Sequence, residues 1–372
     1  MYFSGTNGPD VFYTRPLTLE TNADGDVFEI SDGYYGYGGD DAFRIRVSNV
    51  DVPGLFETSS DIQGNEGNDS LVFAPARDYL GQVDINVSGG SGSDSVKLDL
   101  SKLGSAGIDF TDINGGGFTT IITLLHADGI SAGQFFLRDD IERIEILGTS
   151  AADVLIGNRG NDHLDGGSGA DLFYKTRGSD QYVFDDAGDR VALFDGSIAT
   201  VPADGSDTIW AWVSVDLRDQ YGVENLRLGA DGTEGTGNDA ANLITGSSGR
   251  NTIAGGGGND SLYGKGGADT FSFAEKGAAN RDSIWNFNDD DRIELSQATF
   301  AGLDKDRDGL LDLDALSQTG KALGGVAQLI YNKATGILSY DAEGVGAGAA
   351  EDIAFIGRML GFLDPSDVIL AA

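Results

Sequence analysis

Acidic residues recur along this chain at a fixed spacing of nine residues. The first series runs through Asp153, Asp162, Asp171, Asp180 and Asp189. The second series keeps the same step and runs through Asn242, Asn251, Asp260 and Asp269. A large apolar or aromatic residue lies two positions after each of these residues. Oxygen ligands repeated so regularly are typical of a site for a hard cation.

A nine-residue unit is too short for a helical repeat, and it predicts a six-residue turn followed by a three-residue strand. Two units then form one coil of a solenoid, with turns stacked on two sides and apolar residues in the middle. Glycines precede the acids, as at 166–171 and 255–260, and they suit turns with positive φ and close backbone approach. Stacked carboxylates about 4.8 Å apart repel unless a cation lies between them. Calcium is the predicted cation, because its flexible shell accepts carboxylate and carbonyl oxygens.

The composition agrees with tight turns that carry carboxylates. The 372 residues include 57 Gly, and 48 Asp stand against 12 Glu; the shorter acid and Gly both favour turns. The formal net charge of −36 argues against nucleic acid and anionic membranes as partners. The chain has no Cys, which excludes disulfides and thiolate metal sites. No basic segment followed by an apolar one opens the chain, so no cleavable secretory signal is expected.

The pattern Gly-Gly-x-Gly-x-Asp-x-apolar-x resembles the hemolysin-type calcium-binding repeat of the repeats-in-toxin (RTX) family, most clearly at 89–97, 157–173 and 255–272. The resemblance implies an all-β fold, a calcium-binding parallel β-roll or β-helix solenoid with a C-terminal β cap. It also implies that the loop Asp and the carbonyls of the first and third loop positions bind calcium between coils. The residues implicated are Asp153, Gly157, Arg159, Asp162, Gly166, Ser168, Asp171, Asp180, Gly255, Gly257, Asp260, Gly264, Gly266 and Asp269. Asn242 and Asn251 lack the charge, so weaker or empty sites are expected there.

A looser version of the loop occupies the first third of the chain. Its acids at positions 10, 41, 69 and 94 are unevenly spaced, which predicts longer coils with strand insertions. The expected ligands there are Gly64, Glu66, Asp69, Gly89, Ser91 and Asp94. Whether Asp10 and Asp41 are also ligands is left open. The predicted segments are an irregular β-helix at 1–147, RTX arrays at 148–222 and 223–273, and a cap with a type I secretion signal at 274–372.

The nine-residue step ends at Phe273. Segments 282–287 and 291–296 resemble the cap that follows RTX arrays in proteins exported by the one-step (type I) route, and 329–341 predicts a hairpin. The tail 364–372 resembles an uncleaved secretion signal, with an ordinary final strand as the alternative.

A different acidic loop lies within the predicted cap. Asp304, Asp306 and Asp308 stand at positions 1, 3 and 5 of an EF-hand-like loop, and Gly309 stands at position 6. Ala315 stands where the bidentate Glu belongs. An additional calcium and a plain acidic turn are therefore both open interpretations.

No catalytic signature is evident in the sequence. His126 and His163 are the two histidines, no zinc-protease or nucleophile-elbow motif occurs, and Asp289-Asp290-Asp291 predicts a solvated turn. We therefore expect no enzyme, and predict a secreted, extracellular or cell-surface protein that folds on calcium and self-assembles as a homo-oligomer or sheet, in a surface layer or matrix. Its expected partners are calcium, further copies of itself and the type I secretion machinery.

Two alternatives remain for the function. The first is a calcium-dependent adhesin or polysaccharide-binding accessory protein, in which aromatic clusters at 34–37 and 210–212 stack on sugars. The second is an enzyme with an unrecognised site. A repeat-like loop already begins at Gly5, and an uncovered first coil is expected to invite another chain.

Overall fold

The computed structural model describes residues 2–4, 11–13, 30–35, 39–45, 57–74, 82–102, 108–112, 118–125, 131–138, 140–193, 205–346, 348–357 and 363–371. These residues are nearly all in strands and turns, with short 3-10 turns at Leu217–Asp219, Leu313–Ala315 and Pro365–Asp367. The chain divides into two compact units, Met1–Asp207 and Thr208–Ala372. The four-segment division expected from sequence character stays a prediction.

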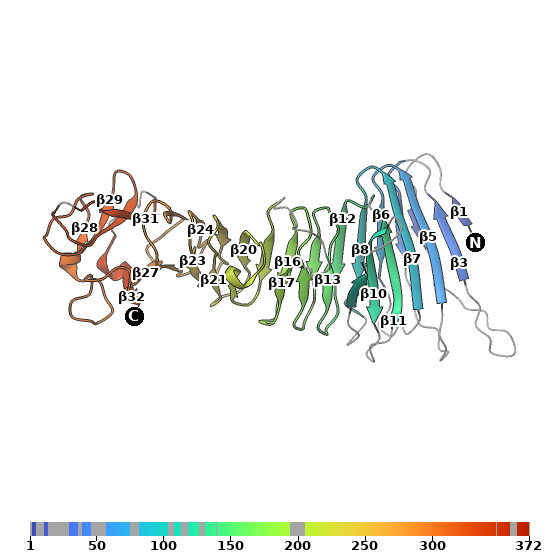
Figure 1. Cartoon of the computed structure of the whole chain (residues 1–372), viewed down its shortest axis with the longest axis horizontal. Coiled ribbons are helices and arrows are strands. Elements are labelled where there is room, and N and C mark those ends of the chain that lie inside the picture. Colours follow the sequence, from blue (N-terminus) through green and yellow to red (C-terminus); the bar gives the residue numbers. More distant parts are fainter. Residues whose placement is uncertain are drawn as a thin grey trace. The chain divides into compact units, whose positions relative to one another are not determined.

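The first unit is a parallel β-solenoid, in which strands of successive coils pair side by side (Figure 1). One of its sheets contains, in spatial order, β1 (Tyr2–Ser4), β3 (Ile30–Tyr35), β5 (Glu57–Glu66), β7 (Gln82–Ser91), β11 (Ser131–Arg138), β10 (Phe118–Leu125) and β9 (Ile108–Asp112). Opposite them run β2 (Val11–Tyr13), β4 (Ala42–Ile45), β6 (Ser70–Phe73), β8 (Ser95–Asp99), β12 (Arg143–Leu147), β14 (His163–Asp165) and β16 (Gln181–Phe184). A third sheet contains β13 (Val154–Ile156), β15 (Leu172–Tyr174) and β17 (Arg190–Ala192).

The coils of the first unit shorten along the chain. Equivalent loop positions are 28 and 25 residues apart at Asp41, Asp69 and Asp94, and 18 residues apart from Asp153 to Asp171. The longer N-terminal coils agree with the expected β-helix, and β10 and β11 form an antiparallel pair inserted at the sheet edge. Two nine-residue units therefore make one coil in the regular part, as the sequence spacing predicts.

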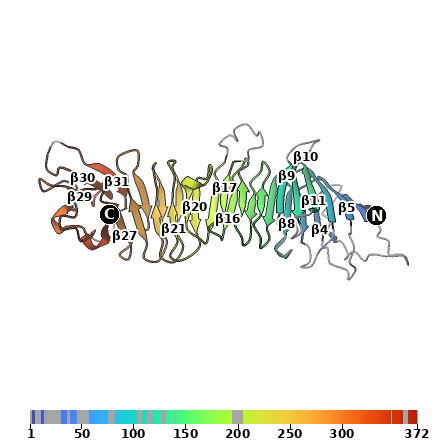
Figure 2. The ribbon, with the colours of Figure 1, turned by 60° about the horizontal axis from the view of Figure 1, so that its bottom comes forward.

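The second unit repeats this architecture (Figure 2). One sheet contains β18 (Thr208–Ala211), β20 (Asn225–Leu228), β22 (Leu243–Thr245), β24 (Ser261–Tyr263), β26 (Asp282–Trp285), β31 (Glu351–Phe355), β30 (Ile337–Asp341), β29 (Gln328–Asn332) and β28 (Leu316–Ser317). The other contains β19 (Val215–Asp216), β21 (Glu234–Thr236), β23 (Thr252–Ala254), β25 (Thr270–Phe273), β27 (Arg292–Ser296) and β32 (Val368–Ala371).

The core of each coil consists of the apolar residue two positions after the loop acid. In the first unit Leu155, Phe173 and Val191 stack in register from coil to coil, and each is at most 2 % exposed. In the second unit Leu262 and Phe271 are fully buried in the same way. Burying one such side chain contributes about 1.5–3 kcal/mol, so the stack defines which face of each strand points inward.

The C-terminal region differs in one respect from the expectation. Segments 282–287 and 291–296 were expected to begin the cap, yet β26 and β27 pair in parallel with β24 and β25 as further coils. Four extra residues break the nine-residue step without breaking the stacking, because they enlarge a loop and leave the strands in register. The predicted hairpin is confirmed, since β29 and β30 pair antiparallel.

The chain's tail also forms part of the sheet, because β32 pairs in parallel with β27. Among the described residues, no helix has the length and apolar character needed to cross a membrane. Asp10 and His126 lie outside the described residues.

Candidate metal centre

The loop acids form columns that run along each solenoid. In each column, the backbone N–H of one loop acid donates to Oδ1 of the acid in the next coil, at 2.7 Å from Asp153 to Asp171 and at 3.0 Å from Asp162 to Asp180. The same bond links Asp69 to Asp94 at 2.7 Å. The acids are buried, with Asp171 at 1 % exposure. One carboxylate oxygen of each acid therefore accepts a hydrogen bond from the backbone. Whether the second oxygen also has a hydrogen-bond partner determines whether the loop needs a cation.

In five of the described loops, the second carboxylate oxygen has no hydrogen-bond partner among the residues that the structure describes. These buried Oδ2 atoms belong to Asp69, Asp94, Asp171, Asp260 and Asp269. An unpaired buried charge is costly, and groups of this kind in a native structure call for an unseen ion or water. All five residues are among the ligands that the sequence predicts.

A glycine at the first loop position makes room for each of these oxygens. A Cβ atom on Gly166 would overlap Asp171 Oδ2, and one on Gly264 would overlap Asp269 Oδ2. At Gly64 the same volume borders Asp69 Oδ2 and the carbonyl oxygen of Gly89 in the next coil. The space above the glycine is thus a small cradle lined by oxygen atoms of two successive loops. Such a hard, all-oxygen donor set fits calcium.

The third loop position is different. The first-position glycines are buried, but Glu66, Ser91, Arg159 and Ser168 are exposed, and Gly257 and Gly266 are half-buried. The carbonyl of Ser91 accepts a hydrogen bond from the backbone N–H of Gly67 at 2.9 Å. The structure therefore brings the first position and the loop acid together at the cradle, and the role expected for the third-position carbonyls stays a prediction.

Other loop acids have protein partners on both oxygens. Asp162 Oδ2 accepts from the backbone N–H of Asn158 at 2.6 Å, although Gly157 provides a cradle. Asp153 Oδ2 accepts from the backbone N–H of Thr149 at 2.7 Å, and Asp180 Oδ2 accepts from Thr176 Oγ1 at 3.0 Å. These acids were predicted as ligands on equal terms with the others, and the structure separates them from the five with a partnerless oxygen.

Asn242 and Asn251 satisfy their positions with their own amide groups. Asn251 Nδ2 donates to the carbonyl of Ala230 and to Thr233 Oγ1, both at 2.9 Å. Asn242 Nδ2 donates to the carbonyl of Glu224 at 3.0 Å. A neutral amide donor thus contacts the oxygens of the preceding coil, which supports the expectation of weak or empty sites there.

Burial opposes the charge of the loop acids. It raises the pKa of Asp171 to about 7 and that of Asp180 to about 8, because desolvation disfavours the charged form. Burial likewise raises the pKa of Asp94 and Asp269 to about 6. The neighbouring acids of each column add to this effect for Asp171 and Asp180. A cation between the coils would relieve both costs.

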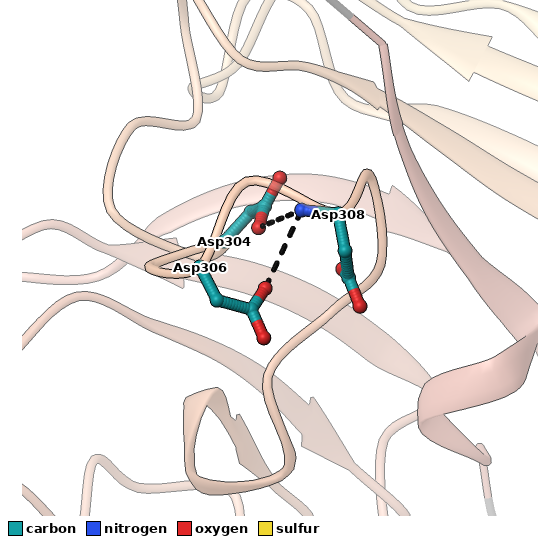
Figure 3. A group of neighbouring side chains, drawn as sticks. All are labelled: Asp304, Asp306 and Asp308. Carbon is teal, nitrogen blue, oxygen red and sulfur yellow. Dashed lines mark hydrogen bonds between the residues drawn. The ribbon is translucent and has the colours of Figure 1, made fainter.

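The EF-hand-like loop gathers three carboxylates within the second unit (Figure 3). Oxygen atoms of Asp304, Asp306 and Asp308 lie within 4.8 Å of one another. The backbone N–H groups of Asp308 and Gly309 donate to the two oxygens of Asp304 at 3.1 and 3.0 Å. Asp306 and Asp308 are exposed, so solvent is available to share any ion. A calcium ion in this loop stays a prediction.

Four column residues were missed by sequence reasoning. Asp207, Asp282 and Asp291 accept from the backbone N–H groups of Asp180, Asp260 and Asp269, and Glu142 accepts from Asp94. Each of the three Asp residues lies 27 or 22 residues after the preceding column acid instead of 18. A search for the regular spacing therefore does not find them. The Asp-x-Ile signature at 207–209, 282–284 and 291–293 is the signal that would have found them.

The assignment of the 289–291 triplet to a solvated turn is partly wrong. Asp289 and Asp290 are exposed, but Asp291 is 1 % exposed. Its Oδ2 accepts from the backbone N–H of Asn288 at 2.9 Å. The Asp291 carboxylate is buried because it accepts a hydrogen bond from the backbone N–H of Asp269 in the preceding coil.

The fold and its glycine cradles define a parallel β-solenoid with stacked acidic loops. A family model described as the RTX calcium-binding nonapeptide repeat, in four copies, matches residues 147–182 and 236–271. These two segments are RTX calcium-binding repeats, and the RTX recognition made from the loop pattern is confirmed. The matched repeats are those of a calcium-binding family.

The other comparisons add little. No curated protein matches the chain. The crystal structure of extracellular lipase LipA from Serratia marcescens is similar at 15 % identity and a TM-score of 0.20, over 94 % of this chain and 41 % of that chain. The chain thus spans less than half of the lipase's length, and at this TM-score the likeness carries no argument about activity.

Proposed function

We propose that the chain binds calcium in the cradles of its stacked loops and folds as an extracellular structural protein when calcium is present. The observation that supports this most directly is a set of five buried Oδ2 atoms that have no hydrogen-bond partner within the described part of the chain, those of Asp69, Asp94, Asp171, Asp260 and Asp269. The first-position glycine and the loop acid of each cradle would hold the ion. Calcium would supply the positive charge that the buried carboxylates lack.

Calcium removal tests this proposal. Extracellular calcium modules have dissociation constants of about 10⁻⁴–10⁻³ M, so the chain should lose strand content in excess chelator and regain it on titration to millimolar calcium. Far-UV circular dichroism of the full chain measures the transition. Identical spectra in chelator and in calcium would contradict the proposal.

We extend the proposal to self-assembly in a surface layer or matrix, outside the cell. The net charge of −36 makes copies of the chain repel one another, and calcium ions can bridge exposed acids of neighbouring copies. Light scattering should rise when millimolar calcium is added to dilute protein. Magnesium should not substitute, because it retains its waters in a strict octahedral shell. A monomer at all calcium concentrations would contradict this extension, and export by the type I route stays a prediction.

A second candidate, a polysaccharide-binding protein, rests on aromatic rings on one face of the second unit. Tyr263 and Trp285 are register partners on β24 and β26, and their rings stack at 5.9 Å with an interplanar angle of 14°. Trp285 is 43 % exposed, and Phe355 meets its edge at 6.3 Å. In the predicted 210–212 cluster, Trp210 instead lies under the guanidinium of Arg227 at 5.4 Å.

Exposed, flat aromatic faces of this kind can stack on sugar rings. Trp285→Ala should abolish retention on immobilised polysaccharide, while Trp212→Ala, which removes an exposed Trp outside the stacked pair, should leave it unchanged. Equal retention of both variants and the parent chain would remove this candidate.

A further inference from the structure

One loop of the first unit has lysine at the first position, where the loops 64–69, 89–94, 157–162 and 166–171 have glycine. Lys175 stands at the first position of the loop 175–180, five residues before the loop acid Asp180. The Lys175 side chain is 6 % exposed, and its ammonium forms an ion pair with Oδ2 of Asp207, whose side chain is fully buried. Lysine is almost never fully buried unless it is paired. The position and the burial of this lysine therefore call for an explanation.

The loop 255–260 shows what the same place looks like without a lysine. A Cβ atom on Gly255 would approach the Oδ2 atoms of both Asp260, in the same loop, and Asp282, in the next coil. Asp260 and Asp282 are connected through the column hydrogen bond at 3.0 Å. Two buried carboxylates thus face one small volume above Gly255. A cation placed there would neutralise both carboxylates together.

The lysine loop has the same three positions. Lys175 corresponds to Gly255, Asp180 to Asp260, and Asp207 to Asp282, because Asp207 accepts from the backbone N–H of Asp180 at 2.8 Å. Here, however, the ammonium lies on the carboxylate of the next coil, and Asp180 Oδ2 accepts from Thr176 Oγ1. Every carboxylate oxygen around this first position has a protein partner.

We propose that the Lys175 ammonium is a built-in counter-ion that takes the place of calcium between the Asp180 and Asp207 coils. This inference rests on the proposed binding of calcium in the other cradles. Asp207 then stays joined to the loop 175–180 without calcium. The other ion pairs between described residues do not share this property, since each has a side chain at least 41 % exposed.

Replacing the lysine with glycine should create a calcium site. The full-length Lys175→Gly chain, which matches the 255–260 loop at this position, should bind one more calcium ion than the parent chain. Bound calcium is counted by equilibrium dialysis and elemental analysis. The matched control is Lys265→Gly, which removes the same charge from an exposed second loop position and should leave the count unchanged.

The outcomes separate the two proposals. A parent chain that binds no calcium would refute the proposed function. Equal numbers of bound calcium ions in the parent and in Lys175→Gly would overturn only the proposal that Lys175 replaces calcium. Lys175→Met keeps the hydrocarbon stem without the charge, so it should gain no calcium and should unfold at a lower temperature, since removing one partner of a buried pair leaves an uncompensated charge.

A double variant covers the case in which Lys175→Gly does not fold. Adding Asp207→Asn to Lys175→Met removes the uncompensated charge and should restore much of the lost melting temperature. If the melting temperature does not recover in this double-mutant cycle, the proposed counter-ion role of Lys175 is overturned.

Discussion

At the scale of the residue, the second carboxylate oxygen of each loop acid is the feature that distinguishes one loop from another. Asp171 Oδ2 lies buried above Gly166 without a partner, whereas Asp162 Oδ2 accepts from Asn158. Both loops match the same sequence pattern. The difference lies in which backbone N–H group reaches the oxygen, and it predicts which cradles hold calcium.

Adding a methyl group at a cradle should weaken calcium binding. In Gly166→Ala the new Cβ overlaps Asp171 Oδ2, so we expect a loss of about 10-fold in affinity for the affected site, at the lower end of the effect of disturbing groups around a metal site. Isothermal titration calorimetry measures it. The control Ser168→Ala alters an exposed residue of the same loop. A loss of the same size in Ser168→Ala would contradict the role of the cradle.

Converting Asn251 to Asp should make its coil depend on calcium. The variant loses the amide donor to Ala230 and Thr233 and gains a buried charge, so it should melt at a lower temperature than the parent chain in chelator. Calcium should raise the melting temperature of the variant back to that of the parent chain. Asn259→Asp adds the same charge at an exposed loop position and serves as the control. Equal melting of Asn251→Asp and the parent in chelator would show that the amide does not replace the cation.

At the scale of the element, short strands remain stacked even where the sequence repeat stops. β26 and β27 pair with β24 and β25 across an offset of 22 residues. The register is held by the inward apolar residue and by the column acid, here Ile293 and Asp291. The loop between strands absorbs the added residues, because its ends stay fixed by the same hydrogen bonds.

The column acid outside the repeat should therefore matter more than its neighbour. Asp291→Ala leaves the buried N–H of Asp269 without its acceptor, which costs about 1–3 kcal/mol. Asp290→Ala removes an equal charge from an exposed position and should change stability by at most about 0.5 kcal/mol. Urea unfolding in calcium compares the two variants. Equal stabilities would argue against β27 as a coil of the solenoid.

At the scale of the whole molecule, calcium should be a large part of the stability. Each site at ten times its dissociation constant adds about 1.4 kcal/mol, so the five cradles with a partnerless oxygen would add roughly 7 kcal/mol, comparable to the stability of an ordinary domain of about 5–15 kcal/mol. Thermal unfolding in millimolar calcium should thus occur far above that in chelator. Equal concentrations of magnesium give the control, and an equal rise in magnesium would contradict the calcium-specific cradle.

Much of the fold and of the candidate site was predictable from local signals. The period of nine with Gly, Asp and an apolar residue determines strand length, coil length and inward face, as at Leu155 and Phe173. The partnerless acids Asp69, Asp94, Asp171, Asp260 and Asp269 were all predicted as ligands. These features depend only on residues close in the sequence, which is why spacing reveals them.

The sequence by itself determined that this protein is a glycine-rich acidic solenoid with RTX loops, because a repeated loop and strand need no distant partner to specify them. Only the tertiary structure decided which carboxylates lack a partner and which are already neutralised. Lys175 reaches Asp207 across 32 residues, and Asp260 meets Asp282 across 22. The stacking of the coils brings these side chains into contact. Because the coils differ in length, no fixed spacing in the sequence predicts which residues meet.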